Sequence, residues 1–512
     1  MRSSWRCDGC AIRRVRCNGG KPCQECQKRS LACTFLRVQR KRGPKGPRVS
    51  TSEKIKQMQE DLYSAMLTSA SADENSPGNS SPETIPPQHA EITHEDYIKY
   101  LDVFKERLYS VWPVVDCDEL IHKLLIHEAD YESYALAASL CAATIAQMRL
   151  PEHDTQEIDG GVTSSQFIEE VHRLRQHFEY REIVSIPSLL TSFFLHIFYA
   201  NAEKIRSAGS LLREAIGCAF GLRMHESESY LPTFSHENQL KIRIFWILFI
   251  SERTYCIQND TPMMLQPIEY LPEVPNDETQ DRKLLSAFVS LTQLFVNLDG
   301  EFARSLYGRS GKGCGSCLGY HRDEMSTAQR DLCTEKDDSD LRESQQVDIA
   351  VTRQWIRTLL WQYTVSHFPV SCNSEDPAFS SLLPAQIAKE TLSTFNKFSP
   401  GAIKVHGYGM ELKLFRLGDA LLDVLVCVPP SSSGHTMLLG ARDALHALEH
   451  LILMVGGGLS PFLQGLRDRM AKSNIPVPWA RWLTLEPPEV EDDSNSTDSI
   501  GGYASLRFPI LA

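Results

Sequence analysis

The chain has 512 residues, of which 42% are hydrophobic and 23% charged, and this composition is typical of a soluble globular protein with room for several domains. The sequence shows neither an apolar leader nor an uncharged apolar run of about 18 residues, so we expect an intracellular protein without a membrane-spanning segment. The formal net charge of −12 is unevenly distributed. Residues 1–50 hold 14 Lys and Arg against two acidic residues, a net charge of +12, which leaves −24 for residues 51–512. A basic arm on an acidic body favours a protein that binds nucleic acid.

Six of the 15 cysteines lie within residues 7–33, where the spacing Cys-x2-Cys-x6-Cys occurs twice. In a reducing compartment such a dense group favours metal binding over disulfides. Zn²⁺ prefers four tetrahedral ligands, so three thiols in each half are too few unless two sulfurs each bind both ions. The sequence therefore predicts a domain over residues 1–36 in which two Zn²⁺ ions share six ligands, two of them bridging. These ligands are Cys7, Cys10, Cys17, Cys23, Cys26 and Cys33.

Two short helices are expected around this cluster, because residues 10–17 and 26–33 each correspond to about two turns of α-helix. Residues 19–22 carry two glycines and a proline, which predict the turn between the halves. A domain this small has too little core to fold unaided, so metal binding should supply its folding energy. The basic side chains near the cysteines would offset the negative charge of the thiolates while facing phosphates, and the first helix is the better candidate for entering the major groove. These side chains are Arg13, Arg14, Arg16, Lys28 and Arg29.

Over its whole length the segment from Cys7 to Cys33 resembles the fungal Zn2Cys6 binuclear-cluster regulators. The resemblance implies that Cys7 and Cys23 are the bridging ligands. It also implies that Arg13 and Arg14 read a CGG triplet, for which arginine is suited because it can bond guanine O6 and N7 together. Arg16, Lys28 and Arg29 would then contact phosphates. The alternatives are a structural zinc knob without a DNA role, which the basic helix disfavours, and a redox disulfide cluster.

Three segments of biased composition follow the cluster. Residues 37–50 are rich in Arg, Lys, Gly and Pro and predict an extended basic linker that binds phosphates or directs nuclear import. Residues 51–67 space their apolar side chains as in a short coiled coil, through which two chains would form a homodimer, or as in a frayed helix. Residues 68–92 are rich in Ser, Pro, Asn and Glu and predict a disordered linker. The residues of the basic linker expected to contact DNA are Arg40, Lys41, Arg42 and Lys45.

The remainder of the chain is expected to be an all-α regulatory domain over residues 93–485, because apolar side chains recur there every three or four positions. Residues 301–345, rich in Gly, Ser and charge, predict a polar insertion or mobile loop. Residues 486–512 place acidic side chains before bulky apolar ones, as in an activation segment. Parts of the body, above all residues 243–266, look like the fungal transcription-factor middle homology domain. With the basic linker, they are most similar to the maltose- and sucrose-type activators.

Individual side chains of the body support two kinds of hypothesis. The sequence predicts an ion network on a helix surface, or a regulatory contact, formed by Arg243, Glu252 and Arg253. Four residues within the polar insertion have zinc-like spacing, namely Cys314, Cys317, His321 and Cys333. The polar composition around them favours a loose loop over a second metal site. The aromatic and apolar side chains of one helix predict core or, alternatively, a ligand pocket, and they are Phe245, Trp246, Leu248, Phe249 and Tyr255. Histidines in helical patterns are expected to be ordinary helix positions, and these are His122, His172 and His196.

The chain carries no nucleophile elbow, P-loop, dinucleotide fingerprint or His-Glu-x-x-His motif, so an enzyme with a zinc-binding appendage is disfavoured. We expect a nuclear, sequence-specific regulator of RNA polymerase II transcription, an activator that binds CGG-containing double-stranded DNA and the transcription machinery and responds to a small-molecule inducer. The genes would serve carbohydrate utilisation. The alternatives are a regulator of a secondary-metabolite gene cluster and a repressor with the same DNA-binding domain.

Overall fold

The computed structural model describes residues 7–13, 15–31, 33–34, 92–127, 129–151, 162–231, 235–275, 280–296, 298, 302, 321–334, 340–427 and 440–473. The chain divides into two units, Met1–Gln88 and His89–Ala512. The predicted basic linker, coiled coil and activation segment, and all of the disordered linker except residue 92, lie outside the described residues. None of the described helices is long and apolar enough to span a bilayer.

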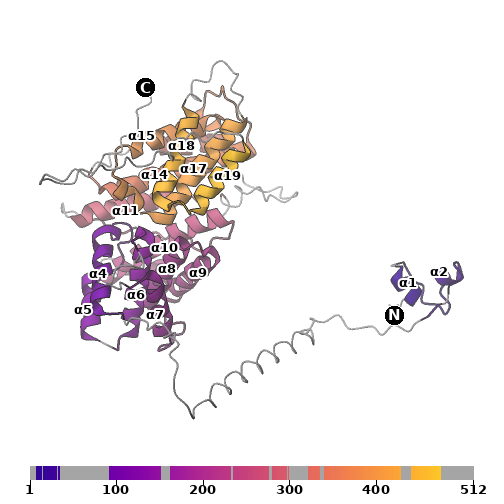
Figure 1. Ribbon diagram of the computed structural model, residues 1–512, viewed down its shortest axis with the longest axis horizontal. Helices are drawn as coiled ribbons and strands as arrows, with labels where there is room; N and C mark the ends of the chain where they lie inside the picture. Colours follow the sequence, from indigo (N-terminus) through magenta and orange to yellow (C-terminus); the bar gives the residue numbers. More distant parts are fainter. Residues whose placement is uncertain are drawn as a thin grey trace, which may run out of the picture. The chain divides into compact units, whose positions relative to one another are not determined.

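The described residues of the first unit form two short helices, α1 (Asp8–Ile12) and α2 (Gln24–Gln27), drawn in indigo in Figure 1. The prediction that each helix runs for two turns to the third cysteine of its half is wrong, because Cys17 and Cys33 both lie on non-helical backbone. Gly19 sits between the halves with φ +76°, a conformation that favours glycine. The two ends of the described part of this unit are joined where the Asp8 N–H donates to Thr34 O at 2.8 Å and the Thr34 hydroxyl donates to Asp8 Oδ2 at 2.7 Å.

The first half of the second unit is a layer of helices drawn in purple and magenta in Figure 1. Thr93 begins the first of them with a reciprocal capping box to Asp96. Ser185 caps α8, and Pro187 lies in the first turn, where a helix tolerates proline. The order is α4 (His94–Val103), a π-helical turn η1 (Phe104–Leu108), α5 (Cys117–Ile126), α6 (Tyr131–Met148), α7 (Ser164–Leu174), α8 (Ile186–Asn201), α9 (Ile205–Gly221), the 3-10 turn η2 (Ser227–Tyr230) and α10 (His236–Asn259). Helix α6 packs between α7 and α8, and α8 continues the layer to α9.

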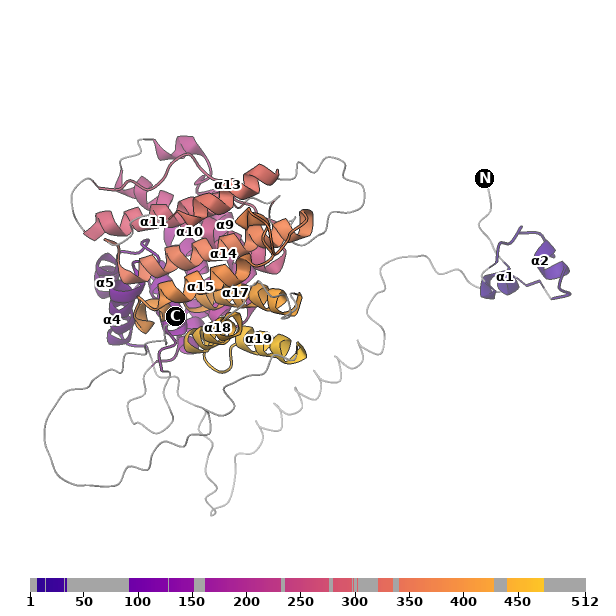
Figure 2. The same ribbon diagram turned by 90° about the horizontal axis from the view of Figure 1, so that it is seen from above.

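The second half forms an adjoining layer, drawn in pink to yellow, and Figure 2 shows α11 and α13 lying alongside α14. It contains α11 (Gln280–Val296), α13 (Arg322–Cys333), α14 (Glu343–His367), η3 (Pro377–Phe379), α15 (Leu383–Phe395), α16 (Pro400–Lys404), α17 (Gly407–Cys427), α18 (Ala441–Gly456) and α19 (Pro461–Lys472). Helix α17 packs against α14, α15, α18 and α19. Within the described residues there is no strand, only an isolated bridge between Ser371 and Ser380. The predicted all-α class is confirmed.

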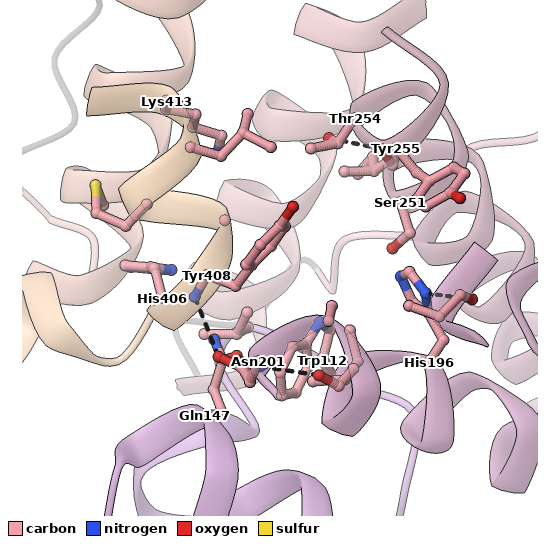
Figure 3. Close-up of a pocket in the computed structure, with 18 of the residues that line it drawn as sticks. Trp112, Gln147, His196, Asn201, Ser251, Thr254, Tyr255, His406, Tyr408 and Lys413 are labelled. Atoms are coloured by element: carbon pink, nitrogen blue, oxygen red, sulfur yellow. Dashed lines mark hydrogen bonds between the residues drawn. The ribbon is translucent and has the colours of Figure 1, made fainter. Parts of the chain in front are cut away.

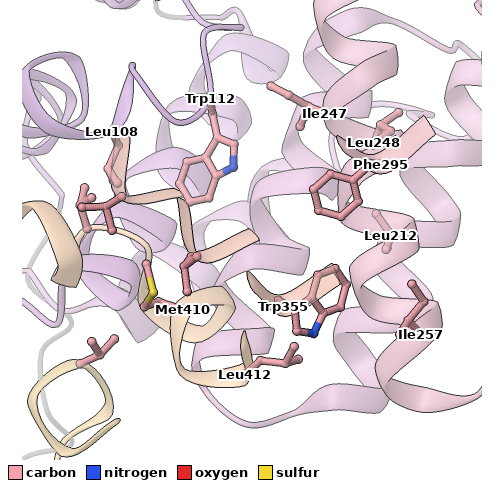
Figure 4. Close-up of a cluster of buried hydrophobic side chains, with 14 of the residues drawn as sticks. Leu108, Trp112, Leu212, Ile247, Leu248, Ile257, Phe295, Trp355, Met410 and Leu412 are labelled. Carbon is pink, nitrogen blue, oxygen red and sulfur yellow. The ribbon is translucent and has the colours of Figure 1, made fainter. Parts of the chain in front are cut away.

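One continuous apolar core joins the two layers. Figure 4 shows Trp112 of the first layer and Met410 of the second among the same buried side chains, with Phe295 and Trp355 beside them. The side chains predicted to be core on α10, namely Phe245, Trp246, Leu248 and Phe249, are buried, and Tyr255 is partly buried. Because the core crosses the boundary, the second unit folds as one body.

The predicted surface ion network on α10 is wrong for two of its three members, because Glu252 and Arg253 are each only 2% exposed. Glu252 accepts hydrogen bonds from the backbone N–H groups of Met264 and Leu265, at 2.6 and 3.0 Å. Arg253 donates to Leu265 O at 3.0 Å and lies over the ring of Phe249. These hydrogen bonds therefore hold the non-helical segment that contains Met264 and Leu265 against α10.

Part of the predicted polar insertion is also helical rather than loop, since α13 and the start of α14 fall within residues 301–345. Of the four residues with zinc-like spacing, Cys314 and Cys317 lie outside the described residues. His321 precedes the first turn of α13 and Cys333 ends that helix. The helix separates the two residues by about 18 Å, so they cannot bind the same ion.

Candidate metal centre and nucleic-acid interface

The cysteines of the first unit converge on one point. Cys7, Cys10, Cys23 and Cys26 have no exposed surface, and Cys17 and Cys33 are partly buried against them. The Sγ atom of Cys7 lies 3.5 Å from those of Cys23 and Cys26, and Cys10 Sγ lies 3.5 Å from Cys23 Sγ. A disulfide needs about 2.05 Å, so the thiols are free.

The six sulfurs form two overlapping groups of four, each with all its sulfurs within 4.8 Å of one another. One group is Cys7, Cys10, Cys17 and Cys23, and the other is Cys7, Cys23, Cys26 and Cys33. The sulfurs of a zinc tetrahedron, with bonds of about 2.3 Å, are about 3.8 Å apart, which the observed separations fit. Cys7 and Cys23 belong to both groups. The residues therefore fit two Zn²⁺ ions with Cys7 and Cys23 as the shared ligands, as the resemblance implies.

Backbone N–H groups donate to three of the sulfurs. Burial and neighbouring cysteines raise the pKa of Cys10 and Cys26, whereas hydrogen bonds lower the pKa of Cys7 and Cys23. The N–H groups of Gly19, Cys23 and Cys26 point at the sulfurs of Cys17, Cys33 and Cys23, at 3.4, 3.3 and 3.4 Å. Burial raises the pKa of Cys23, but the hydrogen bonds from Cys26 and its neighbours outweigh burial and lower that pKa to about 6. For Cys7, burial is likewise outweighed by hydrogen bonds from Cys10, so its pKa is also lowered. Thiolate is the form that binds metal.

Arg13 lies against the cluster instead of extending from it. Its Nε donates to Gly9 O at 3.1 Å, and its Nη2 lies 3.9 Å from Cys10 Sγ and 3.8 Å from Cys26 Sγ. Six thiolates and two Zn²⁺ ions carry a charge of about −2, which this guanidinium partly offsets. The sequence analysis expects basic side chains near the cysteines to offset the charge of the thiolates, and the contacts of Arg13, one helical turn after Cys10, agree with that expectation.

The other predicted DNA-contacting residues are placed as follows. Arg16, Lys28 and Arg29 are exposed, and Lys28 lies 3.7 Å from the carboxylate of Glu25, at a surface where such pairs are weak. These three cations are therefore accessible to phosphates. The remaining predicted contacts lie outside the described residues, and they are Arg14, Arg40, Lys41, Arg42 and Lys45.

Comparisons with known proteins agree with this geometry. Residues 6–43 match the model of the fungal Zn(2)-Cys(6) binuclear cluster domain. Over 493 residues the chain is 25% identical to the maltose fermentation regulatory protein MAL13 of Saccharomyces cerevisiae, covering 95% of this chain and 97% of that protein. It is 26% identical over 425 residues to the probable sucrose utilization protein SUC1 of Candida albicans, covering 81% and 78% of the two chains. A shorter match, 37% over 78 residues, covers 14% of this chain and 12% of the fumonisin cluster-specific transcription factor FUM21 of Gibberella moniliformis.

The domain match covers all six cysteines, and the longer matches extend through the helical body. Residues 6–43 are therefore a fungal Zn(2)-Cys(6) binuclear cluster domain, carried by a chain that is similar over nearly its whole length to fungal regulatory proteins of sugar utilisation.

Proposed function

We propose that this protein is a zinc-dependent, sequence-specific DNA-binding regulator of RNA polymerase II transcription, acting in the nucleus. The observation that carries the proposal is the pair of four-sulfur groups sharing Cys7 and Cys23, within a segment whose net charge is strongly positive. Such a cluster supplies a rigid, metal-stabilised support, and the surrounding cations supply affinity for the phosphate backbone.

Within this function, Arg13 and Arg14 read a CGG triplet in the major groove, and the exposed Arg16, Lys28 and Arg29 hold phosphates. Arg13 must leave the sulfurs of Cys10 and Cys26 to reach a base, so its role in DNA binding is coupled to the charge balance of the cluster. The basic linker, with Arg40, Lys41, Arg42 and Lys45, adds phosphate contacts that do not depend on sequence.

Carbohydrate-utilisation genes are the proposed targets. Of the relatives matched over most of this chain, five are named for maltose fermentation or sucrose utilisation and one as a respiratory transcription factor, whereas the relative named for a secondary-metabolite cluster matches over 14% of it. We further propose that the protein is an activator with residues 486–512 as its activation segment, that residues 51–67 support a homodimer, and that a small-molecule inducer controls its output.

The test of base reading compares variants of the full chain on two duplexes, one with CGG triplets and one with the same bases scrambled. Loss of a bidentate guanine contact lowers affinity by about 1–3 kcal/mol, or roughly 5- to 150-fold, on the CGG duplex alone. We expect this of Arg14→Ala and Arg13→Ala, whereas the control Lys45→Ala should weaken both duplexes equally. Equal losses on both duplexes for Arg14→Ala and Arg13→Ala would refute base reading by these residues.

The activator assignment has a separate test. Residues 486–512, fused to an unrelated DNA-binding domain, should raise reporter transcription, and a variant of the fusion with the acidic residues changed to Asn and Gln should raise it less. A silent fusion would instead favour the repressor or a regulator that recruits a separate activator.

A further inference from the structure

The six sulfurs of the zinc centre differ in the donors that reach them. Backbone N–H groups donate to three of the sulfurs, and a fourth accepts hydrogen bonds from Cys10. The three belong to Cys17, Cys33 and Cys23, and the fourth belongs to Cys7. Within the described residues, no backbone N–H group is found at the sulfurs of Cys10 and Cys26. As zinc ligands these two buried sulfurs carry negative charge, and a charged donor beside them stabilises that charge.

Arg13 supplies such a donor to both of these sulfurs. Its Nη2 donates to Cys10 Sγ at 3.9 Å and to Cys26 Sγ at 3.8 Å. Cys10 belongs to one four-sulfur group and Cys26 to the other. A single nitrogen of the guanidinium therefore contacts one ligand of each zinc site, and these are the two ligands for which the described residues offer no backbone donor.

The backbone of α1 holds Arg13 in this position. The backbone N–H of Arg13 and its Nε both donate to Gly9 O, at 3.3 and 3.1 Å. A Cβ at Gly9 would lie 3.4 Å from Cys26 Sγ, so the first helix passes close beside the second half of the unit. Arg13 is only partly exposed, and salt screens a charge in such a position less than a charge on the surface.

The exposed cations of the unit do not share this contact. Arg16, Lys28 and Arg29 are exposed, and within the described residues no hydrogen bond from any of them to a sulfur is found. Arg16 has the same side chain as Arg13 and lies in the same half of the unit. It is therefore a matched comparison for the role of Arg13.

We propose that Arg13 is a positioning residue of the zinc centre, whose guanidinium stabilises Cys10 and Cys26 as ligands and so retains both zinc ions. Removal of a group that hydrogen-bonds to metal ligands typically lowers metal affinity about 10- to 100-fold. The inference rests on the proposed zinc-dependent function and gives a further role to a residue proposed there to read a base. Because the base contact and the sulfur contacts use the same guanidinium, zinc retention and DNA reading are linked through Arg13.

The experiment measures the zinc affinity of the full chain, without DNA, by competition with a colorimetric chelator of known affinity. Arg13→Met removes the charge and the donors of the side chain and should bind zinc about 10- to 100-fold more weakly than the native chain. Arg13→Lys keeps the charge and should recover part of this affinity. The control Arg16→Met removes an exposed cation and should change the zinc affinity about twofold at most.

A second measurement identifies the sulfurs that Arg13 protects. The zinc-loaded chains are treated with a limiting amount of iodoacetamide, and mass spectrometry identifies the cysteines that are modified first. Because a hydrogen-bond donor lowers the nucleophilicity of a thiolate, Arg13→Met should shift the first modification towards Cys10 and Cys26. A role confined to the bond between Arg13 Nε and Gly9 O would loosen α1 without selecting these two sulfurs.

Three results would overturn the inference. They are equal zinc affinities for Arg13→Met and Arg16→Met, no recovery of affinity in Arg13→Lys, and a first modification that Arg13→Met leaves unchanged. Duplex binding is measured separately, with every chain at saturating zinc. A native chain that binds no DNA loses the proposed function whatever its zinc affinity, whereas equal zinc affinities with intact duplex binding remove only the role of Arg13 at the zinc centre.

Discussion

Replacing Lys413 with methionine removes the strongest partner of a buried carboxylate. Lys413 Nζ donates to Asp348 Oδ1 at 2.7 Å, and the side chains of Lys413 and Asp348 are 9% and 14% exposed. Although burial raises the pKa of Asp348, Lys413 and His406 outweigh it and lower that pKa to about 2. Against an unfolded pKa of about 3.9, this lowered pKa contributes about 2–3 kcal/mol to the free energy of unfolding at neutral pH. Breaking such a pair from one side costs about 3–5 kcal/mol.

The dependence on pH follows from the direction of the shift. In the native protein the folded pKa of Asp348 lies below the unfolded one, so its contribution is present above about pH 4 and is lost as the pH falls towards 2. In Lys413→Met the burial that remains raises the pKa of Asp348 above its unfolded value. The carboxyl group then destabilises the variant as the pH rises. The difference in the free energy of unfolding between the native protein and Lys413→Met should therefore be larger at about pH 7 than at about pH 4.5.

Urea unfolding followed by tryptophan fluorescence measures this difference, because Trp112, Trp246, Trp355 and Trp361 all lie in the helical body. The control is Lys404→Met, which removes an exposed lysine of α16 and should shift the midpoint little. The double variant Asp348→Asn with Lys413→Met should recover part of the loss, since no buried charge remains. Equal midpoints for Lys413→Met and Lys404→Met, or a difference that does not change with pH, would refute the reasoning.

Three further predictions concern packing and metal. In Gly209→Ala the new Cβ would lie 2.0 Å from Tyr255 Oη, so the midpoint of thermal unfolding should fall by several degrees. In Gly217→Ala, on the same helix, the new Cβ meets no atom within 4 Å, so the midpoint should rise slightly. Cys33→Ser removes a ligand from one four-sulfur group and should leave about one zinc ion per chain, whereas Cys23→Ser removes a ligand from both groups and should leave less zinc. Metal-release assays measure the zinc content, and equal contents in the two variants would contradict a bridging Cys23. Chelation of zinc should abolish duplex binding without moving the urea midpoint of the helical body, and a large shift of that midpoint would show that zinc also stabilises the body.

The zinc centre could be predicted from the sequence because all of its ligands lie close together along the chain. The six ligands occupy 27 consecutive positions, and counting tetrahedral ligands requires two shared sulfurs. The path between the ligands could not be predicted in the same way. We expected helices through Cys17 and Cys33, but the sulfurs converge with helices of only five and four residues. In a domain without an apolar core, the metal ligands set the course of the backbone more than helical periodicity does.

In the helical body, features that depend on one helix could be predicted, whereas features that depend on segments distant in sequence could not. Helical periodicity predicted the all-α class and the burial of Phe245 and Trp246, since both depend on the pattern within one helix. It did not predict the burial of Glu252 and Arg253, whose partners come from a later irregular segment. His196 looked like an ordinary helix position, because the cavity beside it (Figure 3) is formed by segments distant in sequence. Tertiary partners of this kind leave no periodic signal.

The central claim, that a zinc cluster gives this protein its DNA sequence preference, is tested most directly by selecting bound duplexes from a random pool with the full chain. The selection is run once with zinc and once after chelation. We predict enrichment of CGG triplets with zinc and no enriched sequence after chelation; two triplets at a fixed spacing would indicate a homodimer, and one a monomer. Enrichment of a motif without CGG would contradict the base-reading assignment, and an unchanged motif after verified zinc removal would contradict the central claim itself.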